Sequence, residues 1–232
     1  MSESFGLWEI FSEADNCIYA DASKVADIVS ENGLRCQVHA PICDWNIAAM
    51  SDRLREASLE ETIANIDAAV EIGAKVVTVH PGLMSMAVGG LEQRAVGYAK
   101  ESMRALDRYV SGMDVTLAIE NMPSMPFFLG RSAEQLGQIV DGTDLGVCFD
   151  IGHANTTGQI DAMIDSFGDR IVNIHIHDNN GQKDEHLTIG DGEIDFQHVI
   201  RRMGGYEGNW IIESKSLESA VQSLSRLENM LS

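Results

Sequence analysis

Residues 171–192 contain side chains that could bind a metal ion. The first six are mostly β-branched, which is typical of a buried strand, and side chains two residues apart in a strand share a face. His175 and His177 therefore point the same way. Turn residues follow, and if the chain is extended beyond them, Asp184 and His186 share a face about 6–7 Å apart along the backbone. Three imidazoles and a carboxylate predict a metal site, although a polar surface loop could hold the same residues by chance.

The remaining histidines strengthen the prediction of a metal site. The sequence has seven histidines, and six of them end or follow predicted strands. These six are His39, His80, His153, His175, His177 and His186. His198 falls instead on a predicted helix, where we expect exposure to solvent. Random placement would not gather six of seven histidines at one edge of a sheet, and imidazole with carboxylate suits zinc or manganese.

Strands and helices alternate throughout the sequence. The predicted strands are residues 6–11, 35–39, 75–80, 115–120, 145–150, 171–177 and 210–213. The predicted helices are residues 22–32, 58–72, about 91–110, a short one capped by 132–135, about 160–167, 196–203 and 217–231. A capping box, Ser58–Leu–Glu–Glu61, opens the second helix after a polar loop over residues 43–56. The strands are continuous apolar runs, which indicates a parallel sheet buried on both faces.

We predict a TIM-type barrel of seven βα units that occupies residues 1–232 as a single domain. Polar residues end almost every strand, and active sites of such barrels lie at that edge. No Gly-x-Gly-x-x-Gly motif follows the first strand, so a dinucleotide fold has little support. Seven strands leave two edges, residues 6–11 and 209–214, where we expect a gap covered by another element or pairing with a second chain. Glu9, on the first of these strands, has inward parity and would need a partner or solvent at the rim.

The composition limits the partners and the location of the protein. The formal charge is −20, from 36 acidic and 16 basic residues, which argues against nonspecific attraction to nucleic acid or anionic membranes. No apolar run is long enough to cross a membrane, and residues 1–4 lack the apolar character of a signal peptide. Four cysteines without Cys-x-x-Cys spacing indicate reduced thiols, with Cys148 in the core. We therefore expect a cytoplasmic protein.

Seven short motifs together carry a resemblance to a known family. They are His39, His80–Pro–Gly, Glu120–Asn, Asp150–x–x–His153, His175–x–x–Asp178, Asp184–x–His186 and Glu213. Their order, strand placement and spacing resemble the xylose isomerase-like barrel superfamily and, within it, endonuclease IV, which binds a trinuclear, usually zinc, cluster. The resemblance implies three metal sites, namely His39, His80 and Glu120; Glu120, Asp150, His175 and Glu213; and His153, Asp184 and His186.

The single-metal isomerases and epimerases of this superfamily use a subset of these ligands. The sequence resembles them equally well at Glu120, Asp150, His175 and Glu213, and the resemblance implies that Glu120 and Glu213 also transfer protons. The sequence departs from endonuclease IV because the family's first strand has no counterpart and the early loop over residues 12–21 is short. Few basic residues lie near the active edge, enough for one phosphate but hardly for a duplex backbone. They are Arg53, Arg55, Arg131, Lys183 and Lys215.

We therefore expect a metal-dependent isomerase or epimerase of a small sugar or sugar phosphate, with one to three divalent ions such as zinc or manganese. Its partner would be the sugar, not nucleic acid or a membrane, and a homo-oligomer is one outcome of the open edges. Candidate substrate-binding residues are Trp45, Asn46, Arg53, His177, Lys183 and Lys215. An equally good alternative is that His177 contacts the metal ligands from behind and does not face the substrate. Two alternatives stay open, an endonuclease IV-like phosphodiesterase for abasic DNA and a metal-holding barrel without a reaction.

Overall fold

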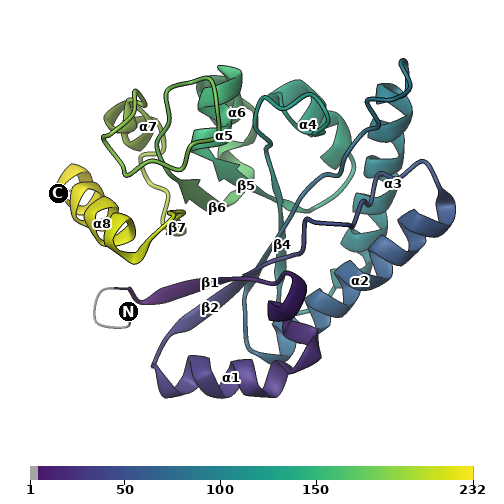
Figure 1. Cartoon of the computed structure of the whole chain (residues 1–232), viewed down its shortest axis with the longest axis horizontal. Coiled ribbons are helices and arrows are strands. Elements are labelled where there is room, and N and C mark those ends of the chain that lie inside the picture. Colours follow the sequence, from purple (N-terminus) through teal and green to yellow (C-terminus); the bar gives the residue numbers. More distant parts are fainter. Residues whose placement is uncertain (1–4, 232) are drawn as a thin grey trace.

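The computed structural model describes residues 5–231, in which seven parallel strands form one sheet in chain order. The strands are β1 Leu7–Phe11, β2 Arg35–His39, β3 Val76–Val79, β4 Thr116–Glu120, β5 Gly146–Asp150, β6 Ile171–Ile176 and β7 Asn209–Ile212. The sheet curls into a nearly closed barrel (Figure 1). The predicted TIM-type barrel with seven βα units is therefore confirmed. Residues 1–4, on which the expectation of no signal peptide was based, lie outside the described residues.

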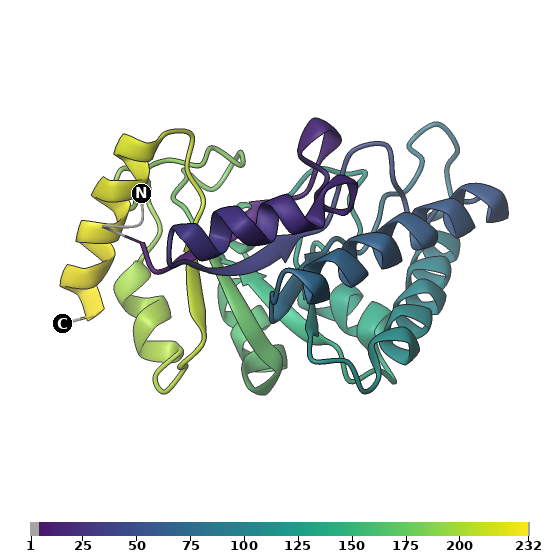
Figure 2. The same cartoon turned by 90° about the horizontal axis from the view of Figure 1, so that it is seen from below.

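Helices surround the barrel and connect its strands (Figures 1 and 2). They are α1 Ala22–Glu31, α2 Asp52–Glu71, α3 Glu92–Val110, α4 Ala133–Val140, α5 Ile151–Thr157, α6 Ile160–Phe167, α7 Phe196–Arg202 and α8 Leu217–Leu231. Three short 3-10 helices are η1 Ala14–Asn16, η2 Ile18–Ala20 and η3 Gly168–Arg170. Within the described residues, none of these helices is both long enough and apolar enough to cross a membrane.

The two faces of the strands differ in polarity. Side chains such as Val38, Leu117 and Phe149 are buried in the apolar core that the helices cover. The alternate positions point into the barrel and carry polar groups, for example Glu9 and Asn173, which hydrogen-bond to each other at 3.1 Å. The apolar layer between sheet and helices stabilises the fold by burial, so the barrel interior is free to hold polar groups that satisfy one another.

The start of α2 contradicts the sequence prediction. We expected a polar loop to residue 56 and a capping box at Ser58, whereas the helix begins at Asp52 after Ser51. Ser58 lies inside the helix, where its hydroxyl donates to the carbonyl of Leu54 at 2.8 Å. The first turns of α2 are mostly exposed, so they lack the apolar periodicity by which we located helices. The predicted cap of α4 is confirmed, because Ser132 accepts a hydrogen bond from the Gln135 amide.

The predicted gap lies between β1 and β7. Each of these strands pairs with only one neighbour in the described sheet, β2 and β6 respectively. A cavity of about 650 Å³ separates them, and α8 lines one side of it with Leu217, Ala220 and Leu224. Trp8 on β1 is 37% exposed there. An opening flanked by another element is thus confirmed, and pairing with a second chain stays a prediction.

Candidate functional site

The carboxyl ends of the strands bring all nine predicted metal ligands together. His39, Glu120, Asp150 and His175 lie on the strands themselves, His80 and Glu213 directly follow strands, His153 lies in the first helical turn after β5, and Asp184 and His186 lie in the loop after β6. These nine residues and His177 form three groups, and in each group one nitrogen or oxygen atom per residue lies within 4.8 Å of the others. The groups are His39, His80 and Glu120; Glu120, Asp150, His175 and Glu213; and His153, His177, Asp184 and His186.

Glu120 joins the first group to the second. One carboxylate oxygen, Oε2, lies 3.1 Å from His39 Nε2 and 2.9 Å from His80 Nε2. The other, Oε1, lies 3.4 Å from His175 Nδ1 and 3.3 Å from His153 Nδ1. The side chain is only 1% exposed. A carboxylate with each oxygen aimed at a different set of imidazoles can bridge two metal ions.

The second group has buried atoms that lack hydrogen-bond partners. Asp150 Oδ2 and His175 Nδ1 are both without one, although both side chains are fully buried. Glu213 Oε1 lies 2.9 Å from His175 Nδ1, and its side chain is 22% exposed. Buried polar atoms without partners are costly, and a cation among them would satisfy them. The donor set of the second group, one imidazole and three carboxylates, fits a zinc or manganese ion.

Glu9 fixes the orientation of the His175 ring. Its Oε1 lies 2.9 Å from His175 Nε2, while its Oε2 accepts hydrogen bonds from Gln37 at 2.5 Å and from Asn173 at 3.1 Å. An imidazole that donates its Nε2–H to a carboxylate keeps Nδ1 free as a lone-pair donor. The inward position expected for Glu9 is therefore confirmed, and its partner is a predicted metal ligand.

Asn121 and Asp150 form hydrogen bonds that position the ligands of the site. Asn121 bridges β4 and β5, because its side chain donates to the Asp150 carbonyl and accepts from the Asp150 amide, both at 2.9 Å. The Asp150 carboxylate in turn accepts a hydrogen bond from the His153 amide at 2.6 Å and so caps the N-terminus of α5. This cap places His153 beside the cluster. Sequence analysis included Asn121 in the Glu120–Asn motif but assigned it no role.

Asp178 organises the loop that carries Asp184 and His186. Its buried carboxylate accepts from four backbone amides, those of residues 179, 190, 192 and 194, at 2.8–3.3 Å. His186 has a positive φ of 48°. The loop is therefore not extended at His186, so the condition under which Asp184 and His186 would share a face is not met. The turn instead brings His186 Nε2 to 3.2 Å from Asp184 Oδ2. Sequence analysis did not foresee the role of Asp178.

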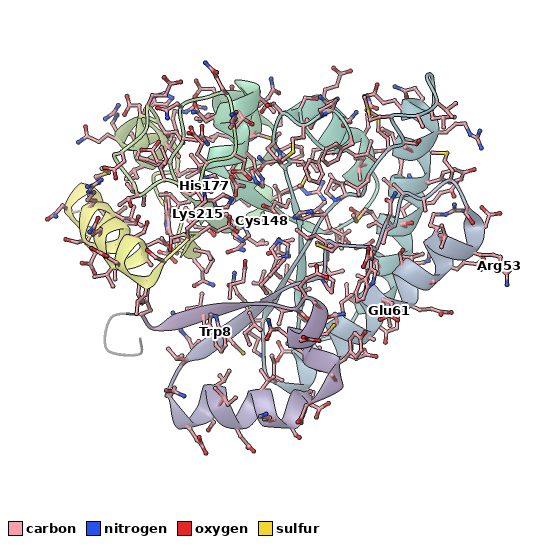
Figure 3. The ribbon with its side chains drawn as sticks, viewed as in Figure 1. Trp8, Arg53, Glu61, Cys148, His177 and Lys215 are labelled. Carbon is pink, nitrogen blue, oxygen red and sulfur yellow. The ribbon has the colours of Figure 1, made fainter. Side chains whose placement is uncertain are left out.

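The candidate substrate-binding residues fall into different places. His177 is fully buried and belongs to the third group. Trp45 is half-buried beside a small cavity that His80 also lines. The Asn46 side chain is committed to hydrogen bonds with Leu83 and Ala48. The charged candidates are all exposed: Arg53 lies in the first turn of α2, far from His177 in Figure 3, Lys183 on the loop after β6, and Lys215 at the β1–β7 gap.

A cavity of about 540 Å³ opens onto the metal-ligand groups. Ligand residues such as Glu120 and Glu213 form part of its wall, and the apolar side chains of Phe11, Met122 and Phe128 form another part. None of the described residues that line it is lysine or arginine. The cavity thus combines several oxygen and nitrogen ligands with an apolar wall, which suits a small polar molecule.

The electrostatics of the site favour a cation. Burial raises the pKa of the Glu120 carboxyl, but the neighbouring imidazoles, His80 and His175 foremost, hold that pKa well below its usual range. Burial lowers the pKa of His153, but the carboxylates around it, Asp150 foremost, raise that pKa to about 10. The carboxylates are therefore ionised and strongly attract positive charge, whether protons on the imidazoles or a divalent ion.

The chain is similar to known proteins in sequence and in structure. The family described as xylose isomerase-like TIM barrel matches residues 5–230. An uncharacterised protein of Methanocaldococcus jannaschii is 32% identical over 237 residues, covering 98% of this chain and 81% of the relative. A probable endonuclease 4 of Bacillus subtilis is 30% identical over 195 residues, covering 74% of this chain and 64% of the relative. The crystal structure of a D-tagatose 3-epimerase-like protein has a TM-score of 0.91 at 32% identity, covering 98% of this chain and 88% of that one.

Proposed function

The chain belongs to the xylose isomerase-like TIM barrel family, and on that premise we propose that it is a metal-dependent isomerase or epimerase of a small sugar. The observation that carries the proposal is the position of Glu120 and Glu213. Both belong to the second ligand group and both line the 540 Å³ cavity. Two carboxylates at the wall of one small cavity can remove and return a proton next to a carbonyl group. The similarity to a D-tagatose 3-epimerase-like protein supports the same class of reaction.

The residues of the second group would hold a divalent ion, which when bound polarises substrate oxygen atoms. Glu213 is the more accessible of the two glutamates, with 22% of its side chain exposed against 1% for Glu120. We assign Glu213 the removal of the carbon-bound proton and Glu120 its return in an epimerisation. Glu9 keeps His175 in one orientation beside both carboxylates, at 2.9 Å from its ring. The apolar wall, Phe11 and Phe128 included, would exclude water from the reacting carbon.

The charge of the cavity narrows the substrate class. A phosphate group is usually recognised by arginine, lysine or a cluster of backbone amides. No described lysine or arginine lines the cavity, and the exposed Lys183 and Lys215 lie outside its wall. We therefore propose an unphosphorylated sugar in preference to a sugar phosphate.

Proton exchange with deuterated water tests the proposal. The metal-loaded protein should exchange a carbon-bound proton of at least one ketose in a panel that includes D-tagatose, and should exchange its phosphorylated counterpart more slowly. Glu213→Gln should reduce exchange by about 100-fold or more, whereas His198→Asn, on α7 outside the site, should not. The metal content of each variant must be measured in parallel, because Glu213 is also a proposed ligand. No exchange with any sugar by fully loaded protein would refute the proposal.

Endonuclease activity is a second candidate because three ligand groups share one site. The grouping through Glu120 matches the ligand set that the resemblance to endonuclease IV implies, and a probable endonuclease 4 is 30% identical. Duplex binding would require several phosphates to be neutralised, which the charge of −20 opposes. Chelator-sensitive incision of abasic duplex DNA, with no sugar exchange, would reverse our order of preference.

A further inference from the structure

The third ligand group contains one more residue than the resemblance implied. His153, Asp184 and His186 alone would leave one position of a tetrahedral ion open. His177, at the end of β6, adds a fourth side chain to this group. The four residues come from the first turn of α5, the end of β6 and the loop behind it. A single ion bound to all four would tie these three segments together.

The Asp184 carboxylate lies close to all three imidazoles of the group. Asp184 Oδ2 lies 3.3 Å from His153 Nε2 and 3.2 Å from His186 Nε2, and Asp184 Oδ1 lies 3.3 Å from His177 Nε2. Ligands about 2.0–2.1 Å from a tetrahedral zinc ion lie about 3.3–3.4 Å from one another. The four side chains therefore lie close enough to converge on one ion once the Asp184 carboxylate and the His186 ring turn toward it.

The hydrogen-bond inventory also points to a cation. His177 Nε2, His177 Nδ1 and Asp184 Oδ1 are buried and lack hydrogen-bond partners. An ion between His177 Nε2 and Asp184 Oδ1 would satisfy two of these three atoms. The His177 and His186 rings are stacked, with centroids 4.0 Å apart and planes 14° from parallel. A metal ion lies in the plane of each imidazole that binds it, so the more exposed ring, His186 with 27% of its side chain exposed, must turn out of the stack for both rings to bind one ion.

Packing holds His177 in this position. A Cβ atom added to Gly152 would lie 2.0 Å from His177 Cε1, so the backbone of α5 leaves the ring no room to move toward it. His177 does not line the 540 Å³ cavity, whereas the other three members of its group do. His177 therefore completes the coordination from behind, on the side that a substrate cannot reach.

We propose that His153, His177, Asp184 and His186 form a closed four-ligand site, which retains a zinc-like ion to hold the loop after β6 in place and does not bind substrate. Structural zinc sites are closed in this way, while catalytic sites keep one position for water or substrate. The proposal concerns metal retention and does not depend on the proposed sugar reaction.

Metal retention in three proteins tests the closed site. Zinc-loaded wild type, His177→Asn and His198→Asn are dialysed against a chelator, and zinc per chain is followed over time by elemental analysis. We expect wild type and His198→Asn, a matched histidine that pairs with exposed Asp161 on the outer surface, to retain one slowly released ion. His177→Asn should release that ion about 100-fold faster. Equal release from His177→Asn and wild type, or no retained ion in wild type, would overturn the proposal.

A measurement on wild type alone covers the case in which His177→Asn does not fold. Cobalt replaces zinc, and the visible spectrum is recorded for the ion that survives the chelator. Four-coordinate cobalt absorbs strongly, and the bands should not change when D-tagatose or inorganic phosphate is added. Weak bands of higher coordination, or bands that shift with either ligand, would show an open site and contradict the closed one. Both outcomes are independent of whether any sugar is turned over.

Discussion

The centre of the sheet and its two edges contribute to the site in different ways. Strands β4, β5 and β6 have neighbours on both sides, and their site residues Glu120, Asp150 and His175 are at most 1% exposed. Strands β1 and β7 have one neighbour each and supply Glu9 and Glu213, which are 7% and 22% exposed. The centre therefore provides rigid ligands, while the edges provide a ring-orienting carboxylate and the more accessible carboxylate.

This difference bears on the proposal that the barrel both retains a metal ion and turns over a sugar. Ligands in a packed sheet are held by the core behind them, so they bind an ion with little loss of entropy. An accessible carboxylate at an edge can reach a substrate and exchange protons with it. The following substitutions test whether the centre and the edges differ in this way, from the largest expected effect to the smallest.

Replacing Glu120 by glutamine should have the largest effect. Glu120 is shared by the first and second groups, and its carboxylate faces several imidazoles. Glu120→Gln should lower the metal content of both groups and reduce sugar proton exchange by about 1000-fold or more. Elemental analysis and deuterium exchange measure the two effects. Glu60→Gln, an exposed glutamate on α2, serves as the control, and unchanged metal content in Glu120→Gln would contradict the bridging role.

Asp178→Asn should destabilise the loop behind β6. The carboxylate accepts from four backbone amides, and an asparagine would place its own N–H groups against some of them. We expect the free energy of unfolding to fall by about 3 kcal/mol, with loss of the ion from the third group. Urea denaturation measures the change. Asp191→Asn, whose carboxylate pairs with Arg226 at the surface, should cost less than about 1 kcal/mol; equal costs for the two would show that Asp178 is not an anchor.

Glu9→Gln tests the contribution of the β1 edge. The substitution replaces the carboxylate beside His175 Nε2 by an amide, so the ring is no longer fixed in one tautomer. We expect the affinity of the second group for metal to fall about 10- to 100-fold, while the third group keeps its ion. Titration calorimetry and nitrogen NMR of the His175 ring would follow this. The same affinity with an unchanged ring signal would mean that Glu9 is only a neighbour.

The smallest effect is expected at Trp8. This side chain is 37% exposed at the gap between β1 and β7. If the gap is open to solvent, Trp8→Ser should change the free energy of unfolding by less than about 1 kcal/mol and leave the sedimentation coefficient unchanged. A larger loss that depends on protein concentration would mean instead that a second chain covers the gap, as the edge strands allow.

The sequence predicted the strand order of the barrel and the residues at its strand ends. Two-residue parity placed His175 and His177 on one face, and the motif order placed Glu120 and Glu213 at the carboxyl ends of their strands. The structure brings both to one cavity. Local patterns sufficed here because a buried parallel strand is a continuous run of apolar residues, and polar residues at or just after the end of such a run mark the edge where a barrel builds its site.

Tertiary structure decided the remaining features. The first turns of α2 are exposed and have no apolar periodicity, so the sequence did not show where the helix begins. The capping box at Ser58 placed the start too late, because Ser58 lies inside the helix. The positive φ of His186 and the four amides around Asp178 depend on a loop folded back on itself. His177 joined the third group because α5 packs on it through Gly152. Such contacts link residues far apart in the chain, and no short-range pattern of residue types encodes them.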